Sequence, residues 1–149
     1  MNLTTQLRSW ARALSADHYN FVGILNPDNS LRSWASLEHA VKHDLPFFIR
    51  LGDHVTAYDL DDENGLVIAE EIVDLFSPEV WLICRSGPGS RAHLFLRHKG
   101  TIPCPRLLAY CKSRGADLRR TIRPPFAKHR DGISRSIPLQ EVSHEMFVL

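Results

Sequence analysis

The stretch HVTAYDLDDENGLVIAEEIVDLF, residues 54–76, joins a strand pattern directly to a helix pattern. HVTAYDL is an apolar run typical of a strand, and GLVIAEEIVDLF places apolar side chains on one helical face and acidic ones on the other. Asp59 and Asp61 stand two positions apart at the end of the strand, so their carboxylates point to the same face. Asp62 and Glu63 follow directly. The stretch therefore predicts a strand that ends in two repelling carboxylates just before a helix.

The rest of the chain also alternates between helix and strand patterns. Gly52 and Asp53 separate two strand patterns and suggest an antiparallel hairpin, and a Gly-Pro-Gly turn suggests a second one, in which His93 and Phe95 share a face. This order predicts one α+β domain over residues 1–149, with a largely antiparallel sheet, flanking helices and one sheet face open to solvent or ligand. The predicted helices are 3–15, 34–43 with Ser33 as its cap, 65–76 and 106–114; the predicted strands are 19–25, 46–51, 54–60, 80–86, 91–98, 116–120 and 145–149.

Length and composition are those of a globular protein with a substantial core: 149 residues, 44% of them hydrophobic. No signal-peptide pattern and no apolar run long enough to cross a bilayer are seen, so we expect no membrane partner. The three cysteines, Cys84, Cys104 and Cys111, form no C-x-x-C pair. Reduced thiols are therefore expected, which fits a cytoplasmic protein.

Charge is strongly segregated along the chain although the net charge is only +1. Residues 1–84 contain 5 Lys and Arg against 13 Asp and Glu, a balance of −8, whereas residues 85–135 contain 13 against 2, a balance of +11. Residues 136–149 contribute −2. Such a basic segment can simply be solvated surface, but its field would also attract a polyanion, so a phosphate-bearing partner is the leading hypothesis.

The carboxylate pair has two interpretations. Hard divalent cations such as Mg²⁺ or Mn²⁺ take oxygen ligands and would relieve the repulsion between Asp59 and Asp61. Alternatively, the pair belongs to an acidic turn before a helix, where Asp62 and Glu63 favour the helix dipole.

The stretch CRSGPGSRAHLFL, residues 84–96, could bind an anion. Its glycines let backbone N–H groups approach a phosphate, to which Ser86, Arg91 and His93 can donate hydrogen bonds. A hairpin turn needs glycine in any case, and a strand histidine is often only a core residue.

The stretch GADLRRTIRPPFAKHRDG, residues 115–132, places Asp117 among several arginines, Arg114, Arg119, Arg120 and Arg123. Asp117 is either a salt-bridged surface acid or the third carboxylate of a metal site beside a phosphate-binding loop.

In order and spacing, these three stretches together resemble the archaeo-eukaryotic primase superfamily, most closely its primase-polymerase branch of phages and plasmids. The resemblance covers residues 55 to 132 and implies an RRM-like sheet with an N-terminal α/β unit. It also implies the roles of nine residues: Asp59, Asp61 and Asp117 as catalytic ligands of two Mg²⁺ or Mn²⁺ ions, Ser86, Arg91 and His93 as ligands of the nucleotide triphosphate, and Arg123, Lys128 and His129 as nucleotide or DNA contacts.

The implied function is template-dependent nucleotidyl transfer to a 3′-hydroxyl, a DNA primase or polymerase activity in phage or plasmid replication. Its partners would be a DNA template-primer, nucleoside triphosphates and a helicase in the same or another chain, in the cytoplasm of a bacterium or a phage-infected cell. His98, Cys104 and Cys111 could supply zinc ligands, but their spacing fits no common structural zinc site, so we expect no zinc.

Two other functions remain open. One is a non-catalytic RRM-like module that binds nucleic acid, which the strands disfavour because they lack paired exposed aromatic residues for base stacking. The other is a metal-dependent nuclease, which uses similar carboxylates but has less need of a histidine that binds a triphosphate.

Overall fold

The computed structural model describes residues 2–15, 21–98 and 104–148, which form an α+β fold with two antiparallel sheets and four α-helices. In chain order the elements are α1 (Leu3–Ser15), β1 (Phe21–Leu25), β2 (Leu31–Ser36), α2 (Leu37–Lys42), β3 (Phe47–Arg50), β4 (Val55–Leu60), α3 (Gly65–Phe76), β5 (Val80–Arg85), β6 (Ala92–Arg97), α4 (Pro105–Ser113), β7 (Asp117–Arg119), β8 (Thr121–Ile122), β9 (Ile137–Pro138) and the 3₁₀ helix η2 (His144–Phe147). None of the helices in these ranges has the length and apolar character that crossing a membrane requires.

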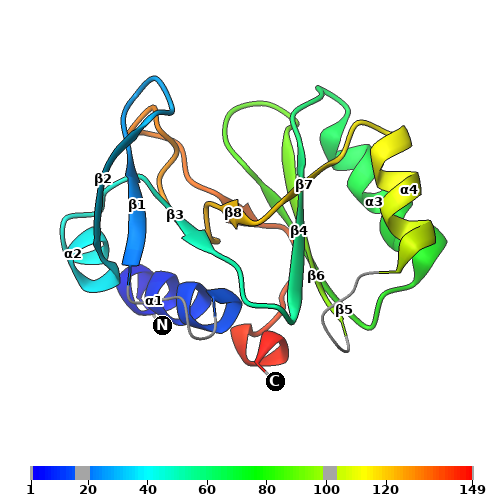
Figure 1. Ribbon diagram of the computed structural model, residues 1–149, viewed down its shortest axis with the longest axis horizontal. Helices are drawn as coiled ribbons and strands as arrows, with labels where there is room; N and C mark the ends of the chain where they lie inside the picture. The colour runs from blue at the N-terminus through cyan, green and yellow to red at the C-terminus, as the bar shows by residue number, and fades with distance from the viewer. Residues whose placement is uncertain (1, 16–20, 99–103, 149) are drawn as a thin grey trace.

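The strands divide into two sheets that stand side by side (Figure 1). The first sheet has the order β2-β1-β3-β8 and the second the order β7-β4-β6-β5-β9. All strand pairs are antiparallel. The antiparallel character that the sequence predicts is thus confirmed, but in two sheets.

The second sheet is built from the continuous run β4-α3-β5-β6-α4-β7. Strands β4 and β5 run in the same direction and are separated by β6, which is antiparallel to both. Helices α3 and α4 lie together on one side of this sheet (Figure 1). The opposite side faces the N-terminal part of the chain.

Side-chain alternation along β4 and β6 separates two hydrophobic cores. Tyr58 and Leu94 pack with α3 and α4, whereas Ala57 and Phe95 pack in the core that contains α1 and β1. His93 shares the face of Phe95, as the alternation predicts. The polar residues of the candidate site lie near the ends of these strands, on the face that carries Ala57 and Phe95.

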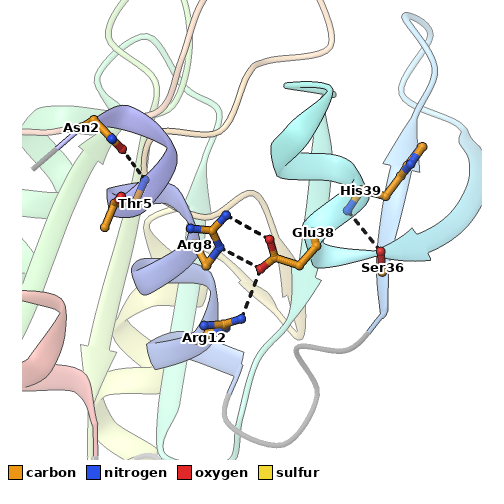
Figure 2. Close-up of polar contacts among 7 residues, drawn as sticks. All are labelled: Asn2, Thr5, Arg8, Arg12, Ser36, Glu38 and His39. Atoms are coloured by element: carbon orange, nitrogen blue, oxygen red, sulfur yellow. Dashed lines mark hydrogen bonds and ion pairs between the residues drawn. The ribbon is translucent and has the colours of Figure 1, made fainter.

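The N-terminal helices are held together by one carboxylate. Glu38 on α2 accepts hydrogen bonds from Arg8 Nε at 2.7 Å and Arg8 Nη2 at 2.9 Å, and from Arg12 Nη2 at 3.2 Å (Figure 2). The same view shows Ser36 Oγ accepting from the backbone N–H of His39 at 3.1 Å, which caps α2. These contacts fix α2 against α1 at the first sheet.

Three predictions are corrected by the structure. The predicted hairpin does not form, because β3 pairs with β1 and β8 whereas β4 pairs with β6 and β7 in the other sheet. Helix α2 begins at Leu37 with Ser36 as its cap, and the preceding residues of the predicted helix belong to strand β2. The predicted closing strand at 145–149 is instead occupied by η2, whose buried Phe147 packs on Trp10 with ring centroids 5.5 Å apart.

Candidate active-site cleft

A cleft of about 580 Å³ opens between the two sheets. Its lining comes from both sheets, namely from β1 and the β1–β2 turn, β3, the end of β4, the β5–β6 turn, β6, β7, β8 and the loop after β8. Its lining includes seven of the nine residues that the resemblance singles out, namely Asp59, Asp61, Ser86, Arg91, His93, Arg123 and His129. A volume of this size is typical of small-molecule sites.

Strand register brings three distant residues into one row. Asp59 on β4 has His93 on β6 and Asp117 on β7 as its Cα partners. Residues directly opposite one another in antiparallel strands project to the same face, so these side chains are neighbours. Their exposure differs: 18% of the Asp59 side chain and 65% of the Asp117 side chain are solvent-accessible.

Asp59 is the carboxylate most strongly affected by its surroundings. Partial burial and the neighbouring Asp61 carboxylate raise the pKa of Asp59 to about 6, against the lowering effect of Arg119 and Arg123. Its Oδ1 atom is buried and has no hydrogen-bond partner among the described residues. This atom would gain most from a cation.

His93 is buried and neutral at physiological pH. Burial, followed by the positive charges of Arg123, Arg119 and His129, lowers the pKa of His93 to about 3. Its Nε2 lies 3.6 Å from Asp59 Oδ1, which is too long for a hydrogen bond, and its Nδ1 has no partner. Because the imidazole is uncharged, this contact is not an ion pair.

Arg119, which the sequence analysis did not select, lies between the carboxylates. Its Nε is 3.7 Å from Asp59 Oδ2, and its Nη2 is 3.7 Å from Asp117 Oδ2. In the described ranges, no group of three acids, histidines or cysteines is placed to hold a metal ion. The signal for Arg119 was present, because it stands two positions after Asp117 on the same strand and therefore shares its face.

Arg123 joins the loop after β8 to the β5–β6 turn. Its Nη2 donates a hydrogen bond to the backbone carbonyl of Ser86, and its buried Nη1 has no hydrogen-bond partner within the described part of the chain. Burial lowers the pKa of Arg123 to about 10, so the guanidinium remains a cation at neutral pH. It supplies a positive charge to the wall of the cleft.

His129 packs directly on the glycine turn. A Cβ atom at Gly87 would lie 3.0 Å from His129 Cδ2, so a larger residue there would have to push the imidazole back by a few tenths of an ångström. Burial and the charge of Arg123 lower the pKa of His129. Arg91 also lines the cleft and makes no ion pair with the described residues.

Two of the nine residues lie outside the cleft lining. Lys128 is turned toward Asp44, with 3.4 Å between Nζ and Oδ2. Asp117 lies on the neighbouring strand but is mostly exposed. Asp62 also differs from its neighbours, because its Oδ1 accepts a hydrogen bond from the backbone N–H of Asn64 at 2.7 Å and stabilises the turn before α3.

The zinc hypothesis involves residues that occupy different environments. Cys111 lies on the buried face of α4 together with Leu107, as its helical position predicts. Cys104 is exposed just before the same helix. The expectation of no zinc stays a prediction.

The cleft therefore contains a carboxylate pair, Asp59 and Asp61, together with side chains that can donate hydrogen bonds to a phosphate group. Comparisons with protein-family models, with curated proteins and with solved structures found no significant match to this chain.

Proposed function

We propose that this protein is a nucleotidyltransferase that adds nucleotides to the 3′-hydroxyl of a primer on a nucleic-acid template, with an RRM-like catalytic sheet of the archaeo-eukaryotic primase type. The observation that carries the proposal is the composition of the cleft. Asp59 and Asp61 share the cleft with five residues that can donate hydrogen bonds to phosphate, Ser86, Arg91, His93, Arg123 and His129. Nucleotidyl transfer needs both sets of residues, since carboxylates hold the cations and hydrogen-bond donors hold the triphosphate.

The topology of the second sheet supports this proposal. Its βαββαβ run has the outer strand β7 beside β4, and β6 between β4 and β5. The same order of elements occurs in ferredoxin-like split βαβ sheets, and the RRM-like sheet of this proposal would have it. Asp59 lies on the inner strand β4, Asp61 directly follows that strand, and Asp117 lies on the neighbouring strand β7.

The donor chemistry suits Mg²⁺ or Mn²⁺, although the three acids are not gathered into a ready-made ligand group in the described part of the chain. Asp59 and Asp61 offer oxygen ligands in the cleft, where the buried Oδ1 of Asp59 accepts no hydrogen bond from a described residue, and Asp117 would have to turn toward them. A bound divalent cation would lower the pKa of the attacking 3′-hydroxyl and neutralise charge on the phosphoryl group. Arg119 contacts two of these carboxylates, so it must release them when a cation binds.

The remaining cleft residues bind and orient the nucleotide. Neutral His93 can donate its single N–H to a phosphate oxygen without adding a charge beside Asp59. The Nη1 group of Arg123 and the guanidinium of Arg91 can donate charge-assisted hydrogen bonds to the triphosphate. Together they would align the α-phosphate with the attacking hydroxyl.

Primer extension tests the proposal. The assay uses a labelled primer on a DNA template, with Mn²⁺ or Mg²⁺ and either deoxy- or ribonucleoside triphosphates. We expect Asp59→Asn and Asp61→Asn each to lower incorporation at least about 100-fold. Asp74→Asn, an exposed acid on α3, is the matched control and should retain full activity. Absence of incorporation by the wild type, or equal incorporation by the Asp59 and control variants, would overturn the assignment.

A non-catalytic module that binds nucleic acid is the second candidate. It is favoured by Arg119, which already offsets the charge of Asp59 and Asp117 without a metal. This function predicts that Asp61→Ala leaves nucleic-acid binding unchanged and that no nucleotide is ever incorporated. Release of nucleotides from DNA without added triphosphates would instead indicate the nuclease.

A further inference from the structure

The outer face of the first sheet exposes aromatic side chains on adjacent strands. Phe21 on β1 is 68% exposed and Trp34 on β2 is 59% exposed. Trp34 is opposite Gly23, which is opposite Phe48 on β3, so these three positions form one row across the sheet. Phe21 stands two positions before Gly23 and shares its face.

Gly23 makes room for the ring of Phe48. A Cβ atom at this position would lie 2.1 Å from Phe48 Cζ, so any larger residue would displace the ring. Phe48 meets Trp34 edge to face, with centroids 5.6 Å apart and an interplanar angle of 79°. The two rings form a paired aromatic platform on the open side of the sheet.

The strands do carry exposed aromatic residues, contrary to the expectation from the sequence. Phe21 and Trp34 are exposed on adjacent strands, and Trp34 pairs with the half-buried Phe48. The pair was missed because Trp34 was placed in a helix, although it belongs to strand β2.

The aromatic face continues into the cleft. Phe48 and Leu25, which face outward from β3 and β1, both line the cleft, together with Thr121 on β8. Arg50 on β3 is opposite Thr121, on the same outer face. It is exposed and makes no ion pair with a described residue, so its charge is available to an anion.

We propose that this outer face, defined by Phe21, Trp34, Phe48 and Arg50, binds single-stranded nucleic acid that enters the cleft. Bases would stack on the aromatic rings, and Arg50 would contact the backbone phosphates of the same strand. Further along that strand, the cationic residues of the cleft wall would contact the next phosphates. Within the proposed function, this strand is the template. The stacking platform itself does not depend on catalysis.

Charge and continuity favour a nucleic acid over a protein partner. The face joins a cleft that is lined by Arg91, Arg119, Arg123 and Arg130, which suits a polyanion. Stacking is also tolerant of sequence, because every base has a π face.

Tryptophan fluorescence and anisotropy test the proposal with metal-free protein and labelled oligo(dT) or oligo(U). Trp34 is the exposed indole, whereas Trp10 is buried and Trp81 is half-buried. Stacking should therefore quench emission in the wild type and not in Trp34→Phe, although that variant keeps a ring and should still bind. Comparison of the two oligonucleotides separates a DNA from an RNA preference.

Truncation variants give the size of the effect. Trp34→Ala and Phe21→Ala should each weaken binding at least about five-fold, since a stacked base contributes about that factor or more. Leu75→Ala, an equally exposed apolar residue on α3, should bind as the wild type does. Arg50→Ala should weaken binding, whereas Arg106→Ala on α4 should not.

Equal binding by Trp34→Ala, Leu75→Ala and the wild type would overturn the inference, and so would a dimer that Trp34→Ala dissociates without a change in oligonucleotide affinity. These results are separable from the proposed function. Loss of binding in Trp34→Ala without any incorporation by the wild type would refute the enzyme and keep the platform. Normal incorporation by the wild type, together with unchanged oligonucleotide binding by Trp34→Ala, would keep the enzyme and refute the platform.

Discussion

Asp59 stands out among the single residues of the cleft because it combines partial burial, a carboxylate neighbour and a buried oxygen without a hydrogen bond. Each of these features raises the free energy of its charged form. A residue that is costly to ionise in the free protein is a suitable ligand for a cation, which removes that cost.

The first prediction concerns Asp59 and pH. Its pKa of about 6 lies above the ordinary value of 3.8, so the folded state holds the proton to a higher pH than the unfolded state. The resulting stabilisation is complete below about pH 4 and is lost as the pH rises through 6. Relative to Asp59→Asn, the wild type should therefore lose on the order of 1 kcal/mol between pH 4.5 and 7.5, after allowance for solvent screening.

Urea unfolding of both proteins in a chelator measures this difference. His93 titrates in both proteins, with its pKa lowered by burial, so its effect largely cancels in the comparison. A constant difference between the wild type and Asp59→Asn would show that Asp59 is ionised in the folded state at all of these pH values.

The second prediction concerns metal binding. Mn²⁺ that binds only the folded protein should stabilise it by about 2.7 kcal/mol at a concentration 100 times its dissociation constant. The thermal midpoint of the wild type should therefore rise with Mn²⁺ and return on chelation, and that of Asp59→Asn should rise much less. Scanning calorimetry measures both, and an equal shift in the two proteins would place the ion elsewhere.

The third prediction concerns Gly65 at the start of α3. A Cβ atom there would lie 2.5 Å from the Leu60 carbonyl oxygen and 3.0 Å from the Ser90 carbonyl oxygen, both backbone atoms that cannot turn away. Gly65→Ala should therefore destabilise the protein by about 2–3 kcal/mol in urea unfolding. Gly89→Ala, which meets no atom within 4 Å but has a φ of 81°, should cost only about 1 kcal/mol.

At the scale of elements, the loop after β8, residues 123–136, folds back on itself as a ribbon with two arms. Its two arms are joined by backbone hydrogen bonds between Phe126 and Ser136 at 2.7 Å and between His129 and Ser134 at 2.8 Å. Asp44, at the end of α2, holds the ribbon through Arg135, whose Nη1 donates to Oδ1 at 2.9 Å, and through Lys128. This anchor places Arg123 and His129 against the β5–β6 turn.

The fourth prediction tests that anchor. Asp44→Asn leaves the size of the side chain unchanged, and asparagine tolerates the positive φ of 50° at this position. The substitution removes the negative charge that binds Arg135 and Lys128. We expect a loss of about 1 kcal/mol in stability and, because the ribbon carries Arg123 and His129, a roughly five-fold increase in the KM for nucleotide. Asp53→Asn, an exposed acid that forms no ion pair with a described residue, is the control. An unchanged KM would mean that the ribbon holds its position without Asp44.

At the scale of the whole molecule, folding brings residues from the acidic and the basic parts of the chain together in one cleft. Asp59 and Asp61 come from the segment with the balance of −8, and the cationic residues come from the segment with the balance of +11. A polyanion would be attracted by the second group, whereas the first group would repel it without a cation.

The fifth prediction follows from this charge distribution. If about four phosphates are neutralised, the logarithm of the affinity for oligo(dT) should fall with the logarithm of salt concentration with a slope of about −3, a loss of roughly 60-fold between 50 and 200 mM. Arg50→Ala should reduce that slope by about 0.7, and Arg106→Ala should leave it unchanged. Anisotropy titrations over this range measure both slopes, and a slope near zero would exclude binding through the phosphates.

Local patterns predicted most elements because their causes are local. The helical spacing of apolar residues in α1 and α3 and the proline at the start of α4 gave these helices close to their observed bounds. The errors fall where a partner decides the structure. Residues 31–36 are strand β2 because β1 offers them a pairing edge, and the C-terminal segment forms η2 because Phe147 packs on Trp10.

By itself the sequence determined the alternation of helix and strand, the shared face of His93 and Phe95 and the separation of acidic from basic segments, since each depends on residues close together in the chain. Only the tertiary structure decided that β3 and β4 belong to different sheets, that Asp117 and His93 flank Asp59, and that Arg119 stands between two of the carboxylates. The physical reason is that strand register and sheet partners are set by hydrogen bonds and packing between distant segments, which no local pattern encodes.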